Sequence, residues 1–166
     1  MVDPPALRSR TTEDGLIWDI YSQVGAWLKS GADSNPLTYG HRHSLVQEAY
    51  GFGYPQTGGY LIDYIKAINP LVVKPDGRPI YDGYLVGVPG GDFVGTVPIN
   101  QCSPAPAGND PRAQIHDVGV PVIQVMSQSD YLFGIASRRP DGNSPPDQYR
   151  HYEMAGAAHA TPHELE

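Results

Sequence analysis

The spacing of apolar and polar residues along the chain predicts helices and strands that follow one another. Near the start, apolar residues recur at helical spacing, and Thr11 or Thr12 can cap the helix that this spacing predicts. The positions on its apolar face are Ile17, Tyr21, Val24 and Leu28. We expect this helix to end near Ser30-Gly31. A second helix is expected over residues 56–68, where Asn69-Pro70 stops it.

The segments with the composition of strands are residues 44–54, 81–90, 119–127 and 148–156. The third of these, GVPVIQVMS, is rich in Val and Ile, as central parallel strands are. Helices and strands that alternate in this order indicate an α/β fold with a mostly parallel sheet. No internal repeat or heptad pattern is present, which argues against solenoids and coiled coils. In such sheets, ligands bind beyond the carboxyl ends of the strands.

Composition narrows the class of protein. The length of 166 residues and the hydrophobic fraction of 40% predict one globular domain over residues 1–166. Glycine and proline, with 19 and 17 residues, exceed a fifth of the chain, so long loops are expected. The net charge is −7 and the basic residues are scattered, so we expect no nucleic-acid partner. No apolar segment approaches the roughly 20 residues that a membrane span needs, and the first residues lack the apolar core of a signal peptide.

Three predicted strands end in residues that can do chemistry. The first ends in the glycine-rich turn Gly53-Tyr54-Pro55-Gln56, the third ends in Ser127-Gln128-Ser129-Asp130, and the last ends near His159. A strand-turn-helix elbow, followed along the chain by an acid and then a histidine, is the order of an α/β-hydrolase triad. The order and the placement therefore indicate a hydrolase site at the carboxyl edge of the sheet.

Several segments carry a resemblance to a known family and cover most of the chain. They are LIWDIYSQVGAWLKS, GYPQTGGYLIDYI, YDGYLVGV, VPVIQVMSQSDYL and YEMAGAAHA. With these segments the sequence resembles the C-terminal half of α/β-hydrolase-domain proteins, in a branch of esterase-like hydrolases whose elbow reads GYSQTGGYL. The resemblance implies a partial α/β-hydrolase-type sheet, mostly parallel and flanked by helices, that lacks the N-terminal strands.

The resemblance also implies which residues occupy the family's catalytic positions. The nucleophile's place falls on Pro55, the acid's on Asp130 and the base's on His159. The backbone N–H of Gln56 is then the expected donor to the oxyanion. Pro55 has no nucleophilic atom, and its φ, fixed at about −65°, is one that a nucleophile elbow commonly does not accept. We therefore expect this turn to be relaxed or rebuilt.

The strands that α/β-hydrolases have before the elbow strand bear on whether this chain associates with a partner. Hydrolases of this kind have several strands before the elbow strand, and a loop of that half supplies the second oxyanion donor. Without those strands, the elbow strand is expected at an open edge of the sheet. An open edge predicts a homo-oligomer, another partner protein or a rearranged sheet. The missing half also makes the sequence look like a fragment, a split gene product or an artificially shortened chain.

Other side chains compete for the role of nucleophile. Thr57, the second residue of the predicted helix, fits a cap or packing role better. Ser127 and Ser129 lie in the acid loop and are weaker candidates. Cys102, the single cysteine, cannot form an intrachain disulfide, and it fits a partly buried bystander or a former disulfide partner of the absent half better than a nucleophile.

The histidines raise the question of a metal site. One residue separates His41 from His43, and His159 and His163 lie four residues apart, a spacing that zinc ligands also use. However, Pro162 interrupts the second pair, and the two pairs are far apart in the sequence. We therefore expect no metal, and no other cofactor.

Two functions of different classes follow. The first is a serine-esterase-like hydrolase of carboxylic esters with an altered elbow and weak activity on a small-molecule ester. It would use an alternative nucleophile or a water activated by His159 with Asp130 behind it. The second is a non-catalytic binding or assembly module, or a truncated fragment without a function of its own. The sequence predicts a soluble protein that has no signal peptide and is cytoplasmic as given, although relatives are often exported, and it leaves the acyl and alcohol groups open.

Overall fold

The computed structural model describes residues 16–40, 43–89, 114–132 and 138–160. The helices in these ranges are α2 (Leu16–Leu28), α3 (Gln56–Asp63) and the π-helix η1 (Tyr64–Ile68). The strands are β1 (Thr38–Tyr39), β2 (His43–Ser44), β3 (Tyr50–Gly53), β4 (Gly83–Gly87), β5 (Val122–Ser127), β6 (Gly142–Ser144) and β7 (Asp147–Met154). None of the helices in the described part of the chain is long and apolar enough to cross a membrane.

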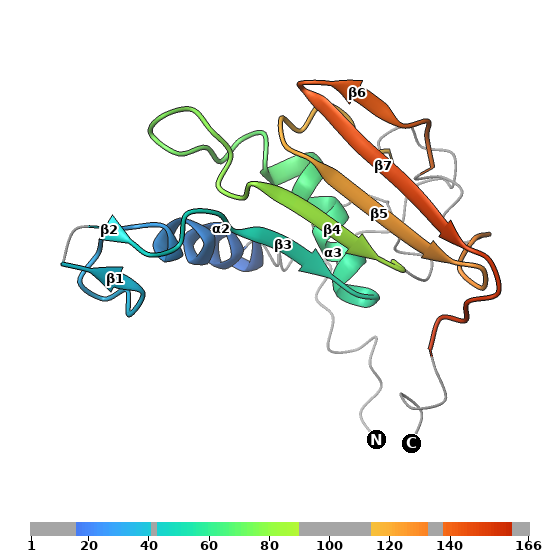
Figure 1. Cartoon of the computed structure of the whole chain (residues 1–166), viewed down its shortest axis with the longest axis horizontal. Coiled ribbons are helices and arrows are strands. Elements are labelled where there is room, and N and C mark those ends of the chain that lie inside the picture. Colours follow the sequence, from blue (N-terminus) through green and yellow to red (C-terminus); the bar gives the residue numbers. More distant parts are fainter. Residues whose placement is uncertain (1–15, 41–42, 90–113, 133–137, 161–166) are drawn as a thin grey trace, which may run out of the picture.

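One sheet contains five of these strands in the order β3-β4-β5-β7-β6 (Figure 1). Strands β3, β4, β5 and β7 are parallel, and β6 runs antiparallel to β7. The register places Phe52 beside Leu85, and Leu85 beside Ile123. The predicted α/β class with a mostly parallel sheet is therefore confirmed, and the four parallel strands are the four that the sequence predicts. Their carboxyl ends meet at one edge of the sheet.

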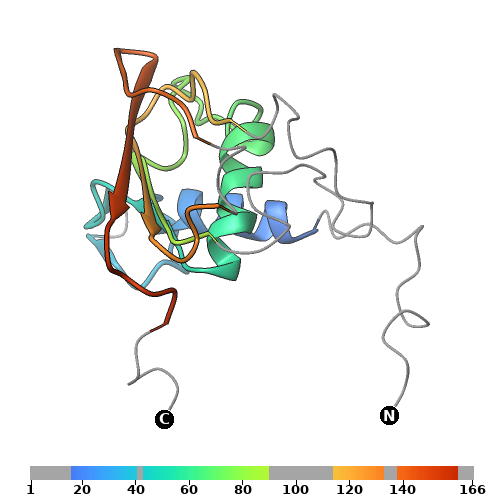
Figure 2. The ribbon, with the colours of Figure 1, turned by 90° about the vertical axis from the view of Figure 1, so that its right-hand side faces the viewer.

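Helices α2 and α3 lie on the same face of the sheet (Figure 2). The core between the two layers contains Trp18 from α2, Ile62 from α3 and Ile65 from η1, together with Val86 and Val122 from the central strands. Each of these side chains is buried. Burial of an aliphatic or aromatic side chain contributes about 1.5–3 kcal/mol, so this layer contact is the main source of stability in the described region.

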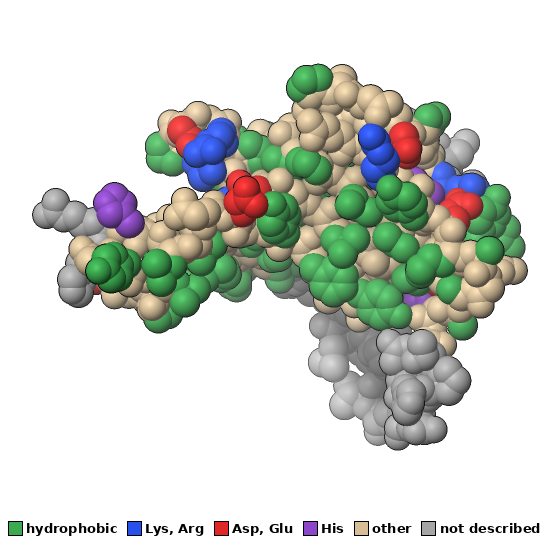
Figure 3. Space-filling view, in the orientation of Figure 1, with side chains coloured by type: hydrophobic (Ala, Val, Ile, Leu, Met, Phe, Trp, Pro, Cys, Tyr) green, Lys and Arg blue, Asp and Glu red, His purple; other side chains and the backbone are tan. Residues whose placement is uncertain are grey.

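The other face of the sheet carries apolar side chains that stay exposed. Phe52, Leu85 and Ile123 alternate with buried residues along their strands and point away from the helices, and Tyr152, which pairs with Val125, is also exposed. Figure 3 shows hydrophobic side chains gathered over the strands on this face. Parallel sheets normally have both faces covered, so an exposed apolar face of this kind is a candidate contact surface.

Strand β3, which leads into the elbow, forms an edge of the sheet. Among the described residues it pairs only with β4, and Tyr50 and Phe52 are both exposed on it. The prediction that the elbow strand lies at an edge is thus confirmed within the described residues. A strand in this position presents backbone N–H and C=O groups that no neighbouring strand satisfies.

The strand predicted over residues 44–54 is shorter than expected. β3 begins only at Tyr50, because the segment before it makes different contacts. The backbone N–H of Ala49 donates to the Asp82 carboxylate at 2.8 Å instead of joining a strand ladder. That carboxylate also forms an ion pair with Lys29, so it ties α2 to the start of β3.

The helix predicted over residues 56–68 is present but changes type halfway. The backbone N–H of Asn69 donates to the oxygen of Tyr64, five residues earlier, at 2.8 Å. The Asn69 side chain donates to the backbone oxygen of Val118 at 3.1 Å and accepts from the Tyr84 hydroxyl at 2.7 Å. These contacts with distant segments hold the wider π-type turn of η1 at the end of the helix.

Two short antiparallel pairs are additions that the sequence pattern does not predict. They are the pair of β1 with β2 and the pair of β6 with β7. The expected caps of the first helix, Thr11 and Thr12, lie outside the described residues.

Candidate active site

The turn between β3 and α3 brings the backbone closer to the helix than a side chain would allow. A Cβ added at Gly53 would lie 2.5 Å from the backbone oxygen of Thr57. A Cβ at Gly58 would lie 3.2 Å from the backbone oxygens of both Gly53 and Gly87. Glycine at position 53 is therefore a steric requirement of this turn, and Gly58 lets α3 pack closely on the ends of β3 and β4.

Pro55 stands at the start of α3 with φ −74° and ψ −45°. These are ordinary helical angles, and proline adopts them without strain in the first turn of a helix. The backbone oxygen of Pro55 accepts a hydrogen bond from the N–H of Gly58 at 3.1 Å. The turn is thus relaxed, as the presence of proline predicts, and it lacks the strained backbone of a nucleophile elbow.

The backbone next to the elbow does contain one strained residue. Val88, which follows β4 directly, has a positive φ of 41°. A β-branched residue rarely adopts this conformation, which costs on the order of 1–3 kcal/mol. Val88 is buried, and its N–H donates to the backbone oxygen of Val125 at 2.7 Å. The strain therefore lies at the carboxyl ends of the central strands, the edge where the site residues gather.

Asp130 and His159 meet beyond the carboxyl ends of β5 and β7. The Nδ1 atom of His159 lies 2.7 Å from Oδ1 of Asp130, within hydrogen-bond distance. Asp130 is only 4% exposed, whereas 40% of the His159 side chain is exposed. The buried carboxylate therefore holds one nitrogen of the ring, and the other nitrogen, Nε2, remains for a proton from solvent or from a bound molecule.

Two serines complete the surroundings of the Asp130 carboxylate. The hydroxyls of Ser127 and Ser129 both donate to its Oδ2 atom, the one from Ser129 at 3.3 Å. With the His159 ring on Oδ1, each carboxylate oxygen has a partner, as a buried charge requires. Both hydroxyls therefore serve to orient the acid. The sequence signal for this arrangement is a serine three residues before an aspartate at a turn, a spacing that also occurs in ordinary turns and so does not by itself mark a site.

The segment that carries His159 is anchored to the acid loop. The N–H of Gly156 donates to the side-chain oxygen of Gln128 at 2.6 Å, and the N–H of Gln128 donates to the oxygen of Ala157 at 3.1 Å. Gly156 has φ +78°, a conformation that glycine adopts without strain. Gln128 thus fixes the turn that leads from β7 to the histidine.

A third connection joins the histidine to the elbow. The Tyr54 hydroxyl donates to the backbone oxygen of His159 at 2.7 Å. The two rings are stacked, with centroids 6.3 Å apart and planes 24° apart. The residue beside Pro55 therefore contacts the segment of the predicted base directly. The carboxyl ends of β3, β5 and β7 meet at this point, as the sequence analysis expects.

Gln56 begins α3, so its backbone N–H is one of the donors that a helix leaves free at its amino end. The positive end of the helix dipole adds to this donor. The arrangement is compatible with the predicted oxyanion contact.

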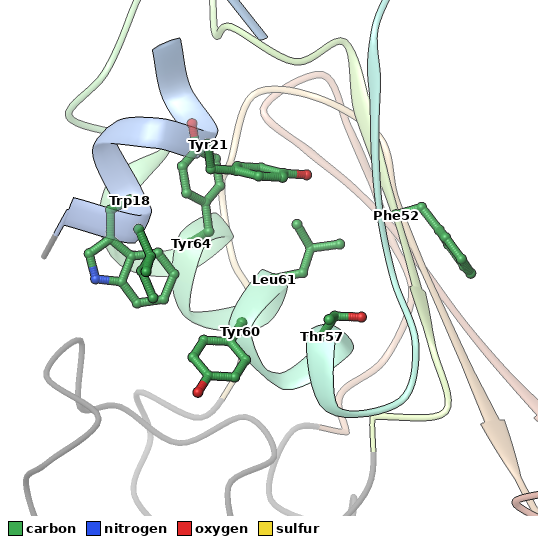
Figure 4. Close-up of a pocket in the computed structure, with 8 residues that line it drawn as sticks. Trp18, Tyr21, Phe52, Thr57, Tyr60, Leu61 and Tyr64 are labelled. Atoms are coloured by element: carbon green, nitrogen blue, oxygen red, sulfur yellow. The ribbon is translucent and has the colours of Figure 1, made fainter. Parts of the chain in front are cut away.

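An apolar groove of about 470 Å³ runs alongside β3 (Figure 4). Trp18 and Tyr21 from α2 and Tyr60 and Leu61 from α3 line it on the helix side. Phe52 lies on the opposite side of the strand from Tyr21 and Leu61. The groove therefore lies next to β3, which is an edge strand among the described residues.

The strongest pKa shifts lie away from Asp130 and His159. Burial raises the pKa of Tyr21 to about 12 and also raises the pKa of Tyr64, Tyr81 and Tyr84. These hydroxyls thus stay protonated at neutral pH, and two of them donate inside the core, Tyr81 to the backbone oxygen of Tyr21 and Tyr84 to the Asn69 side chain. Burial lowers the pKa of His151 on β7, despite the nearby Glu153 carboxylate.

No group of three or more His, Cys, Asp or Glu side chains that could hold a metal ion occurs among the described residues. Cys102, His41 and His163, which are candidates in the sequence, lie outside those residues.

The profile of one protein family, described as alpha/beta hydrolase domain, matches residues 3–166. Comparison with curated proteins and with solved structures gave no significant match. The family match spans every described helix and strand.

Proposed function

The chain belongs to the alpha/beta hydrolase domain family, and on that premise we propose that it hydrolyses carboxylic esters of small molecules. The observation that carries the proposal is the 2.7 Å contact of His159 Nδ1 with the buried Asp130 carboxylate beside the elbow. A carboxylate in this position favours the tautomer with its proton on Nδ1 and stabilises the imidazolium that forms when Nε2 takes a proton.

The reaction proceeds without a covalent intermediate, because Pro55 offers no nucleophilic atom. His159 Nε2 takes a proton from a water molecule as the water oxygen attacks the ester carbonyl carbon. The N–H of Gln56 stabilises the negative charge on the carbonyl oxygen. The tetrahedral intermediate then expels the alcohol oxygen, which receives the proton from His159, and the acid product leaves. The rate is low, because only general-base and oxyanion contributions remain.

The test is hydrolysis of a short-chain activated ester by the purified chain and by His159→Ala. His116→Ala is the matched control, because His116 is an exposed histidine that hydrogen-bonds Gln114. Exposed imidazoles hydrolyse activated esters slowly, and this control separates that background from the site. We expect turnover that His159→Ala loses and His116→Ala keeps. Equal turnover in all three proteins, or none in any, would contradict the proposal.

A serine-directed phosphonate probe with intact-mass measurement identifies the mechanism within the same experiment. Hydrolysis without a probe adduct supports an activated water. Hydrolysis with an adduct would point to a hydroxyl nucleophile, and digestion of the adduct would locate it.

A second function, binding of a partner strand, is favoured by the edge position of β3 among the described strands and by the groove beside it. An extended segment paired with β3 would satisfy the backbone groups of the edge and place alternate side chains over Trp18 and Tyr60. Residues Gly51 and Gly53 of β3 face the helices, so the β3 of a second copy would leave the groove unfilled. The partner that fits is a strand with large apolar residues at alternate positions.

This second function is tested by sedimentation and thermal shift of the chain with apolar extended peptides. Phe52→Asp places a charge on the groove, whereas Leu71→Asp places one at an exposed residue outside it. We expect peptide binding that Phe52→Asp abolishes and Leu71→Asp keeps. The proposal is contradicted if the chain stays monomeric and if peptides, esters and acids all leave its melting temperature unchanged.

A further inference from the structure

Tyr54 is fixed on three sides at the elbow. Its hydroxyl donates to the backbone oxygen of His159 at 2.7 Å, and its ring stacks on the imidazole. Below the ring lies Gly87, where an added Cβ would come 3.1 Å from Cδ2 of Tyr54. The backbone N–H of Tyr54 donates to the Thr57 hydroxyl at 2.8 Å. The tyrosine therefore has one well-defined place between the end of β4 and the histidine.

The His159 ring needs more than Asp130 to fix its orientation. A single hydrogen bond at Nδ1 holds one atom of the ring but lets the plane tilt about that contact. The side chain is 40% exposed, so packing restrains it only in part. The stacked ring of Tyr54 restrains the plane, and the hydroxyl restrains the backbone of the same residue. Together with Asp130, these contacts fix the direction of Nε2.

We propose that Tyr54 is the positioning residue of His159, and that the elbow turn, although it carries no nucleophile, contributes to the site by holding the base. The kinetic consequence rests on the proposed ester hydrolysis, whereas the effect on the imidazole does not. Tyr54 acts on the reaction only through His159, so its loss lowers kcat and leaves KM unchanged.

The variants Tyr54→Phe and Tyr54→Ala separate the two contacts. Tyr54→Phe keeps the stacked ring and loses the hydroxyl, whereas Tyr54→Ala loses both. Tyr50→Phe is the matched control, because it removes a tyrosine hydroxyl that donates to Glu48 at the exposed edge, away from His159. Loss of one neutral hydrogen bond corresponds to about a fivefold effect. We expect Tyr54→Phe to lower kcat by about fivefold, Tyr54→Ala to lower it further, and Tyr50→Phe to leave it unchanged.

A spectroscopic measurement on the full chain decides the proposal independently of activity. The ring proton on Nδ1 of His159 gives a nitrogen-correlated NMR signal, which is assigned by its disappearance in His159→Ala. We expect this proton to exchange with solvent faster in Tyr54→Phe, faster still in Tyr54→Ala, and at the wild-type rate in Tyr50→Phe.

The outcomes are distinguishable. If the wild-type chain hydrolyses no ester but the Nδ1 proton responds to Tyr54→Phe, the proposed hydrolysis fails and the positioning role stands. If Tyr54→Phe and Tyr54→Ala lower only the melting temperature, with kcat and the Nδ1 signal unchanged, Tyr54 is merely structural and the proposal is overturned.

Discussion

The Thr57 hydroxyl donates to the backbone oxygen of Tyr54 at 2.9 Å and accepts from the backbone N–H of the same residue at 2.8 Å. One side chain thus satisfies both backbone groups of the residue that begins the elbow. A hydroxyl with its proton engaged in this way is not poised to attack a substrate. Thr57 therefore closes the turn through the backbone of Tyr54, and α3 itself has no side-chain hydrogen bond at its cap.

Thr57→Val should destabilise the fold without abolishing ester turnover. Valine has the same shape but leaves the backbone groups of Tyr54 without a partner, which costs about 1–2 kcal/mol. Thr57→Ser keeps the hydroxyl and should recover most of the stability. Urea unfolding of the two variants measures the difference. If Thr57 were the nucleophile, Thr57→Val would instead abolish probe labelling and ester turnover that Thr57→Ser retains.

Pro55→Ser should increase ester hydrolysis, because it places a hydroxyl at the elbow beside the segment that carries the base. The helical angles at position 55 suit serine as well as proline. We expect the rate of ester hydrolysis to rise roughly tenfold. In a preorganised site, loss of the triad serine lowers the rate by about 10⁶-fold. The gain here is much smaller because the turn is relaxed. Pro55→Ala, which changes the backbone in the same way, should show no gain. Labelling of the serine variant alone by the phosphonate probe would confirm the origin of the activity, and equal rates in the two variants would exclude a latent site.

Gly53→Ala should destabilise the protein more than Gly87→Ala does. The new Cβ at position 53 meets backbone atoms of Thr57 and Gly58 at 2.5 to 2.8 Å, which cannot move without displacing α3. At position 87 it meets a ring atom of Tyr54 at 3.1 Å, which can shift slightly. We expect losses of about 3 kcal/mol and about 1 kcal/mol in the free energy of unfolding. Thermal unfolding of both variants gives the comparison, and the reverse order would mean that the elbow is more open than described.

His151 should make stability depend on pH. Only 9% of its side chain is exposed, and burial lowers its pKa. Its Nε2 lies 3.2 Å from Glu153 but lacks hydrogen-bond geometry, and Nδ1 lies 3.2 Å from the Tyr149 hydroxyl. Below the unfolded pKa of about 6.5, the unfolded chain binds a proton that the folded chain does not, so the free energy of unfolding falls as the pH drops.

The charged groups around His151 set the size of this effect. Glu153 and Asp141 favour the protonated ring, Arg138 opposes it, and burial outweighs them. Between pH 7 and about 5.5, the uptake of one proton by the unfolded chain lowers the free energy of unfolding by at most about 1.4 kcal/mol per pH unit. Denaturant unfolding across this range should show a smaller fall for His151→Gln than for the wild type, while His116→Gln, at an exposed position, should match the wild type. A fall of the same size in His151→Gln would assign the dependence to other groups.

The sequence predicts the parts of the site that depend on the order of the strands. Asp130 and His159 each follow a parallel strand, and parallel strands bring their carboxyl ends to one edge. Their contact could therefore be expected before any coordinates. The position of β3 at an edge is what the resemblance to α/β-hydrolases implies, because the strands that precede the elbow strand in that family have no counterpart among the segments of this chain that resemble it.

Contacts between distant segments could not be predicted. The Tyr54 hydroxyl reaches a backbone oxygen 105 residues later, and nothing in the local sequence marks a tyrosine for that bond. The π-type turn of η1 depends on Asn69 contacts with Tyr84 and Val118, which exist only in the folded chain. Strand β6 is too short to show an alternating pattern of its own.

The helical backbone of Pro55 has a consequence for the history of the gene. Proline and serine codons of the CCN and TCN types differ at a single base, and position 55 has angles that either residue adopts. An exchange between the two is therefore a short genetic step that leaves the turn in its relaxed form, and a working elbow would need a change of backbone as well as of codon.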